Sequence, residues 1–64
     1  MEGFIERMVN EKDDIYDRKM KLFEFTQSEK FKGLDEDVVR HMVCQLNAME
    51  LYYYHLDKRL GYYI

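Results

Sequence analysis

Residues 38–63, VVRHMVCQLNAMELYYYHLDKRLGYY, contain the pattern that decides the fold. Apolar side chains recur there in alternating steps of three and four residues, which is the a/d repeat of a helix packed along another helix, as in a coiled coil. We therefore predict one long helix over about residues 36–60. The repeat is continuous at Val39, Met42, Leu46, Met49, Tyr53, Leu56, Leu60 and Tyr63.

Both ends of this helix carry the expected signals. Asp35 precedes the repeat and is a good N-cap, because its carboxylate can accept a hydrogen bond from a free backbone N–H. Lys58 and Arg59 suit the negative end of the helix dipole. Gly61 follows them and can end the helix.

A second helix is predicted over about residues 3–27, where apolar residues again follow a helical period. Lys12 and Lys19 interrupt this stripe, and we expect their stems to lie along it while the ammonium groups reach water. The chain contains no proline that would break either helix. The stripe consists of Ile5, Met8, Ile15 and Leu22, widened by Val9, Tyr16 and Phe23.

Residues 28–35 form a short elbow between the two helices, in which Ser28 can start one helical turn and Phe31 and Leu34 are apolar anchors. The predicted fold class is all-α: an antiparallel two-helix hairpin, with residues 1–64 as a single domain. Two helices cannot surround a core, and the one cysteine permits no intrachain disulfide. We therefore expect a symmetric homo-oligomer, in which hairpins assemble into a helical bundle.

The net charge, the apolar runs and the residue composition exclude several classes of protein. A formal net charge of −3 does not suit a protein that binds duplex nucleic acid. No apolar run is long enough to cross a membrane, and the first residues do not resemble a signal peptide, so we expect a cytoplasmic protein without membrane contact. Cys44, His41 and His55 do not form a metal-binding pattern, and we expect neither a metal nor a cofactor.

Catalytic patterns are also missing, so we do not expect an enzyme. His41 and His55 are separated by four helical turns, or about 21 Å, and cannot act on one proton. Cys44 has no neighbour that would favour a thiolate, and we interpret it as a small buried apolar residue. The acidic residues near position 14 are interpreted as a solvent-exposed face with ion pairs Asp14–Arg18 and Asp17–Lys21.

Beside the apolar repeat, Gln45, Tyr52 and Arg59 recur every seven residues and form one row. An aromatic ring can stack on a nucleobase, a guanidinium can bind phosphate, and an amide can bind the edge of a base. The other interpretation is that this row is the polar rim of a helix–helix contact, where tyrosine is common. A second row is more typical of such a rim and consists of His41, Ala48, His55 and Tyr62.

The chain resembles a family of small bacteriophage accessory proteins, related to those of crAss-like phages. The resemblance extends over FIERMVNEKDDIYDRKMKLFEF, SEKFKGLDED and QLNAMELYYYHLDKRL, with a departure at DVVRHMVC. The matching positions are Phe4, Ile5, Arg7, Glu11, Lys12, Lys21, Leu22, Ser28, Phe31, Leu34, Gln45, Ala48, Met49, Tyr52, Leu56 and Arg59.

The architecture is also similar to that of phage anti-CBASS sponges, which are helical oligomers that sequester cyclic di- and trinucleotides between protomers without hydrolysing them. This resemblance implies host defence evasion in the cytoplasm of an infected bacterium. It implies stacking by Tyr52 and Tyr54, and phosphate binding by Arg59 and Lys58, beside Gln45. Two alternatives stay open: a phage adaptor or inhibitor that binds protein through an apolar helix face, and a structural virion component.

Overall fold

The computed structural model describes residues 2–64, and this part of the chain is helical without a strand. It contains two long helices, α1 (Glu2–Thr26) and α3 (Glu36–Gly61), and the single-turn helix α2 (Glu29–Lys32) between them. The all-α class predicted from the sequence is therefore confirmed.

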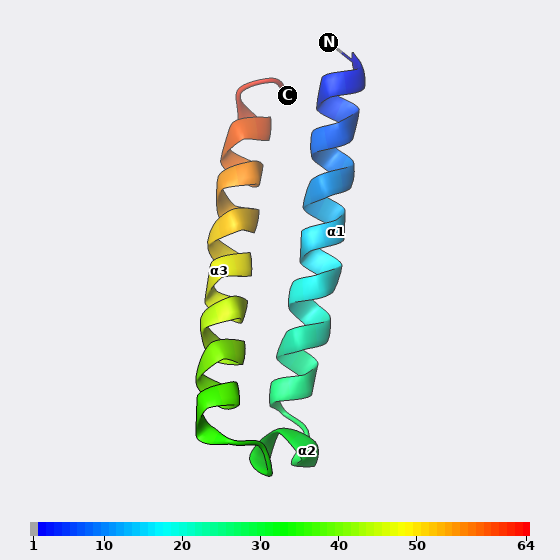
Figure 1. Ribbon diagram of the computed structural model, residues 1–64. Helices are drawn as coiled ribbons and strands as arrows, with labels where there is room; N and C mark the ends of the chain where they lie inside the picture. The colour runs from blue at the N-terminus through cyan, green and yellow to red at the C-terminus, as the bar shows by residue number, and fades with distance from the viewer. Residues whose placement is uncertain (1) are drawn as a thin grey trace.

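The helices α1 and α3 lie side by side, with α2 at one end of the pair and both chain termini at the other (Figure 1). Phe4 packs edge-on against Tyr63 near the termini, with ring centroids 5.5 Å apart. Further along the pair, the rings of Tyr16 and Tyr53 are 5.7 Å apart. The result is a rod with extents of 47 × 14 × 13 Å, too thin to enclose a large core.

The core sits near the termini and is small. Met8, Leu56 and Leu60 are the buried residues among those described, each with 3% of its surface exposed. Most other residues of the α3 repeat are half-buried, because they face α1 on one side only. Phe4, Ile5 and Ile15 pack against the three buried side chains.

The elbow and the start of α3 are held by capping hydrogen bonds. The Ser28 hydroxyl accepts from the backbone N–H of Phe31 at 3.3 Å and donates to the carbonyl of Phe25 at 2.6 Å. The rings of Phe25 and Phe31 meet edge to face, 6.2 Å apart. Asp35 caps α3 as predicted, with its carboxylate accepting from the Asp37 N–H at 2.9 Å.

Two predictions from the sequence are wrong, one about Cys44 and one about ion pairs within α1. Cys44 is exposed rather than buried, because it follows Met42 by two positions and so points away from the face that contacts α1. The ion pairs expected within α1 do not form among residues 2–64. The pairs that do form there are Lys12–Asp57, Glu29–Lys32 and Asp37–Arg40.

Across the described residues, neither long helix is apolar enough to cross a bilayer.

Candidate functional site

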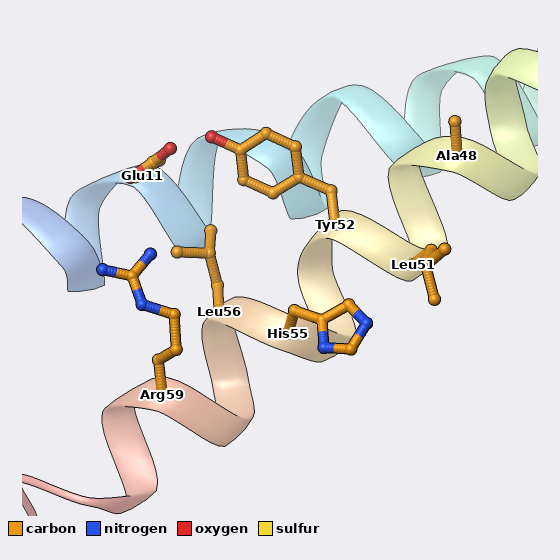
Figure 2. A pocket seen from close by; sticks show the side chains of 7 residues that line it. All are labelled: Glu11, Ala48, Leu51, Tyr52, His55, Leu56 and Arg59. Carbon is orange, nitrogen blue, oxygen red and sulfur yellow. The ribbon is translucent and has the colours of Figure 1, made fainter.

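An open groove of about 380 Å³ runs along one flank of the helix pair. One residue of α1, Glu11, forms part of its lining, and α3 supplies the rest (Figure 2). The α3 residues are Ala48, Leu51, Tyr52, His55, Leu56 and Arg59.

The period of α3 explains why these side chains meet. Ala48, Tyr52, His55 and Arg59 are separated by four, three and four residues, so they share a face beside the one that contacts α1. Leu56 belongs to the core and forms an apolar floor. Ala48 leaves room above its backbone because its side chain is a single methyl group.

The groove is mostly apolar, with polar groups at its edges. Tyr52 and Arg59 reach toward α1 on either side of Leu56, and Glu11 lies near both of them (Figure 2). Arg59 makes no ion pair with any residue in the described part of the chain, so its guanidinium can bind an anion. Tyr52 is 46% exposed, so part of this aromatic residue is accessible for stacking.

A second, smaller cavity of about 210 Å³ adjoins the groove. It is lined by Glu11, Asp14, Ile15, Arg18 and Tyr52, so Glu11 and Tyr52 belong to both spaces. The second cavity is richer in charge than the first, with Glu11, Asp14 and Arg18 around it. Together the two spaces offer the Tyr52 ring, the Arg59 and Arg18 guanidinium groups and carboxylate oxygens within one chain.

The residues predicted as a site divide into two groups. Tyr52 and Arg59 come together in the groove. Gln45 is exposed but is not part of the lining. Tyr54 and Lys58 are also outside it, and the Lys58 ammonium lies 5.3 Å from the centre of the Tyr54 ring.

Sequence reasoning missed other parts of the groove. Ala48 and His55 were assigned to a rim row, but they line the groove together with Tyr52 and Arg59. Leu51 carries a sequence signal that could have revealed it, because it is a large apolar residue outside the α3 repeat. In the structure it is 59% exposed. Glu11 carries no such signal, since only the packing of α1 on α3 places it there.

The opposite flank holds a cluster of cations and aromatic rings. Lys12 donates to the Asp57 carboxylate at 2.6 Å and lies 5.4 Å from the centre of the Tyr53 ring. The Lys19 ammonium lies 4.9 Å from the same ring and 5.2 Å from that of Tyr16. The hydrogen bond raises the pKa of Lys12 and lowers the pKa of Asp57, because it favours the charged form of both.

Metal ligands do not cluster in the described residues: no three of their His, Cys, Asp and Glu side chains are placed to hold an ion. The fold and the groove thus define a small helix-pair protein with a groove that aromatic, charged and apolar side chains line. Its sequence matches the family described as Sequestin over residues 2–62, and the chain belongs to that family. Comparison with curated proteins finds no match, and comparison with solved structures finds none either.

Proposed function

We propose that this protein is a phage-encoded sponge that binds a cyclic oligonucleotide immune signal without altering it, in the manner of anti-CBASS sponges. The single observation that carries the proposal is the groove, where the exposed Tyr52 and the Arg59 guanidinium meet over an apolar floor. The family description, Sequestin, supports a sequestering role. Such a role is exercised in the cytoplasm of the infected bacterium, where the signal is made.

In this proposal, one nucleobase stacks on Tyr52 and covers Leu56, which removes apolar surface of both partners from water. Base stacking on an aromatic side chain contributes about 1–3 kcal/mol and tolerates different bases. Arg59 binds a phosphate with two parallel N–H···O hydrogen bonds, a geometry that lysine cannot reproduce.

The second cavity accounts for the rest of a nucleotide. Carboxylates bind ribose hydroxyls in dinucleotide-binding proteins, and Glu11 and Asp14 provide such oxygens next to the Tyr52 ring. Arg18 adds a cation for another phosphate. This division of tasks explains how a chain of net charge −3 can bind an anion, since only the local surface must be positive.

Sequestration requires affinity and no chemistry. The groove contains one histidine, His55, and its ring packs edge-on against Tyr54, 5.2 Å between centroids, rather than beside a carboxylate. The resemblance to sponges implied a pocket between protomers, whereas both walls of this groove belong to one chain. We therefore assign one ligand to each hairpin.

The proposal is tested by calorimetric titration and thermal melting with a panel of cyclic di- and trinucleotides. A ligand present at 100 times its dissociation constant stabilises the folded state by about 2.7 kcal/mol. Tyr52→Ala and Arg59→Ala should each abolish the stabilisation, and Arg59→Lys should weaken binding. The ligand should be recovered intact after incubation.

The neighbouring residues provide matched controls. Tyr54→Ala removes the same ring two positions away, and Lys58→Ala removes a cation one position away, both outside the groove lining. Both variants should bind like the wild type. If Lys58→Ala and Arg59→Ala lose affinity equally, the ligand is held by general positive charge and the groove assignment is wrong.

The alternative function is that of a protein-binding adaptor or inhibitor. It is favoured by exposed apolar side chains outside the groove, among them Val9, Tyr16 and Phe23. Under this alternative, no nucleotide of the panel changes the melting temperature, and a host protein is retained on the immobilised chain.

A further inference from the structure

The flank opposite the groove carries a row of exposed apolar side chains. Val9, Tyr16 and Phe23 recur every seven residues along α1 and are 37%, 43% and 46% exposed. Because an interval of seven residues is close to two turns, they form one row on the flank where Tyr16 meets Tyr53. An apolar row of this spacing is typical of a helix that packs against a further helix.

The facing part of α3 carries a matching row. Val43, Glu50 and Asp57 also recur every seven residues, and Asp57 lies on this flank because it pairs with Lys12. Val43 is 41% exposed. We call the two rows together the Tyr16 face; it consists of Val9, Tyr16 and Phe23 on α1 and of Val43, Glu50 and Asp57 on α3.

One carboxylate of this face, and one cation that contacts the Tyr16 ring, make no ion pair within the described residues. Lys12 is paired with Asp57, but Lys19 makes no ion pair within the described residues and rests on two aromatic rings. Glu50, which is exposed, makes none there either. A partner that covers the face should therefore offer a carboxylate to Lys19 and a cation to Glu50.

A second copy of this chain meets that requirement. A two-fold axis parallel to the helices keeps every residue at its level along the rod and places α1 of one chain on α3 of the other. Tyr16 is level with Tyr53, so Lys19, three residues further along α1, is level with Glu50, three residues back along α3. By the same count, Phe23 is level with Leu46, beside Val43.

We propose that the Tyr16 face is the interface of a homodimer, in which two hairpins form a four-helix bundle with a two-fold axis along its length. Each α1 row packs against the partner's α3 row, and Lys19 pairs with the partner's Glu50 in two symmetric contacts. All neighbouring helices in this bundle run antiparallel, an arrangement common in four-helix bundles. The groove lies on the other flank, so each chain keeps its own groove open to solvent.

The test uses the charge pair, because both side chains can be changed without touching the core. Lys19→Glu and Glu50→Lys each place like charges opposite one another in both symmetric contacts of a homodimer. Mixed in equal amounts, the two variants can form a heterodimer in which both contacts join opposite charges. Contacts within one chain cannot produce this recovery, because each chain carries like charges at positions 19 and 50.

Mass in solution is measured by sedimentation, with helix content followed by circular dichroism. Wild type should have twice the chain mass of 7.9 kDa, and each single variant should dimerise at least tenfold more weakly. The mixture should recover the doubled mass, together with any helix content that the single variants lose. Phe23→Glu should also dissociate the dimer, and the control Leu51→Glu, on the groove flank, should not.

Three results would overturn the proposal. The first is a single-chain mass for the wild type at micromolar concentration. The second is an equimolar mixture of Lys19→Glu and Glu50→Lys that does not recover the doubled mass. This result counts against the proposal whether the single variants are helical or unfolded. The third is dissociation of the dimer by Leu51→Glu but not by Phe23→Glu, which would place the interface on the groove flank.

Discussion

The ammonium of Lys12 and the carboxylate of Asp57 are 2.6 Å apart although 45 residues separate them in the chain. This is the ion pair that joins α1 to α3, since the others observed among residues 2–64 lie within single turns of one helix. Lys12 also lies 5.4 Å from the centre of the Tyr53 ring, so both of its contacts depend on the position of α1 along α3. A one-turn slip would separate the two charges and leave both without a partner.

The first prediction concerns the pH dependence of this pair. The pKa of Asp57 is lowered from its ordinary value of 3.8 by the hydrogen bond from Lys12, so its stabilising effect is complete above that value and is lost as the pH falls through the lowered pKa. The pKa of Lys12 is raised from 10.5 by the same bond, so its effect is complete below 10.5 and is lost as the pH rises through the raised pKa.

We therefore expect a favourable coupling between Lys12→Met and Asp57→Asn in a double-mutant cycle at pH 7 that disappears in strong acid. Urea denaturation of the four proteins at pH 7 and pH 2 measures it. Both side chains are solvated, so added salt should weaken the coupling at pH 7. Equal stability of wild type and Asp57→Asn at pH 7 would show that the pair adds no stability.

The second prediction concerns the core. Leu56→Ala should lower the free energy of unfolding by about 2–5 kcal/mol, because it leaves a cavity among the few buried side chains of the rod. Leu51→Ala removes the same atoms from an exposed position, and its effect should be within about 0.5 kcal/mol. Comparable losses in urea unfolding would mean that Leu51 is covered in solution.

The third prediction concerns the tyrosine between the two lysines. Tyr53→Phe should be nearly neutral, because the ring that faces Lys12 and Lys19 is retained. Tyr53→Leu keeps an apolar side chain but removes the π face, and each cation–π contact at an exposed site contributes about 0.5–1 kcal/mol. Thermal melting of the two variants, alone and combined with Lys19→Met, should show that the loss depends on Lys19. A loss independent of Lys19 would assign it to packing.

The fourth prediction concerns the start of α3. Asp35→Ala should destabilise the fold by about 0.5–2 kcal/mol, because the N–H of Asp37 loses its acceptor. Asp35→Asn and Asp35→Ser keep an acceptor and should restore most of the loss in chemical denaturation. A similar loss in all three variants would indicate that the negative charge matters more than the hydrogen bond.

The sequence by itself determined the helices. The repeat from Val39 to Tyr63 predicts α3 because apolar side chains at steps of three and four must share one face of a helix. Ser28 and Asp35 predicted the two caps, since each can supply an acceptor to a free N–H at a helix start. These are local effects, in which residues a few positions apart act on one another whatever the rest of the chain does.

Only the tertiary structure decided which side chains meet across the helices. Glu11 joins Tyr52 in the groove, and Lys12 meets Asp57 on the other flank, because α1 lies on α3 at one particular level and rotation. The sequence pattern allows each helix to slide or rotate by a fraction of a turn, and such a shift changes every contact between residues distant in the chain. Packing in three dimensions selects one of these arrangements, and so it placed Lys12 beside the Tyr53 ring and Tyr16 against the same ring.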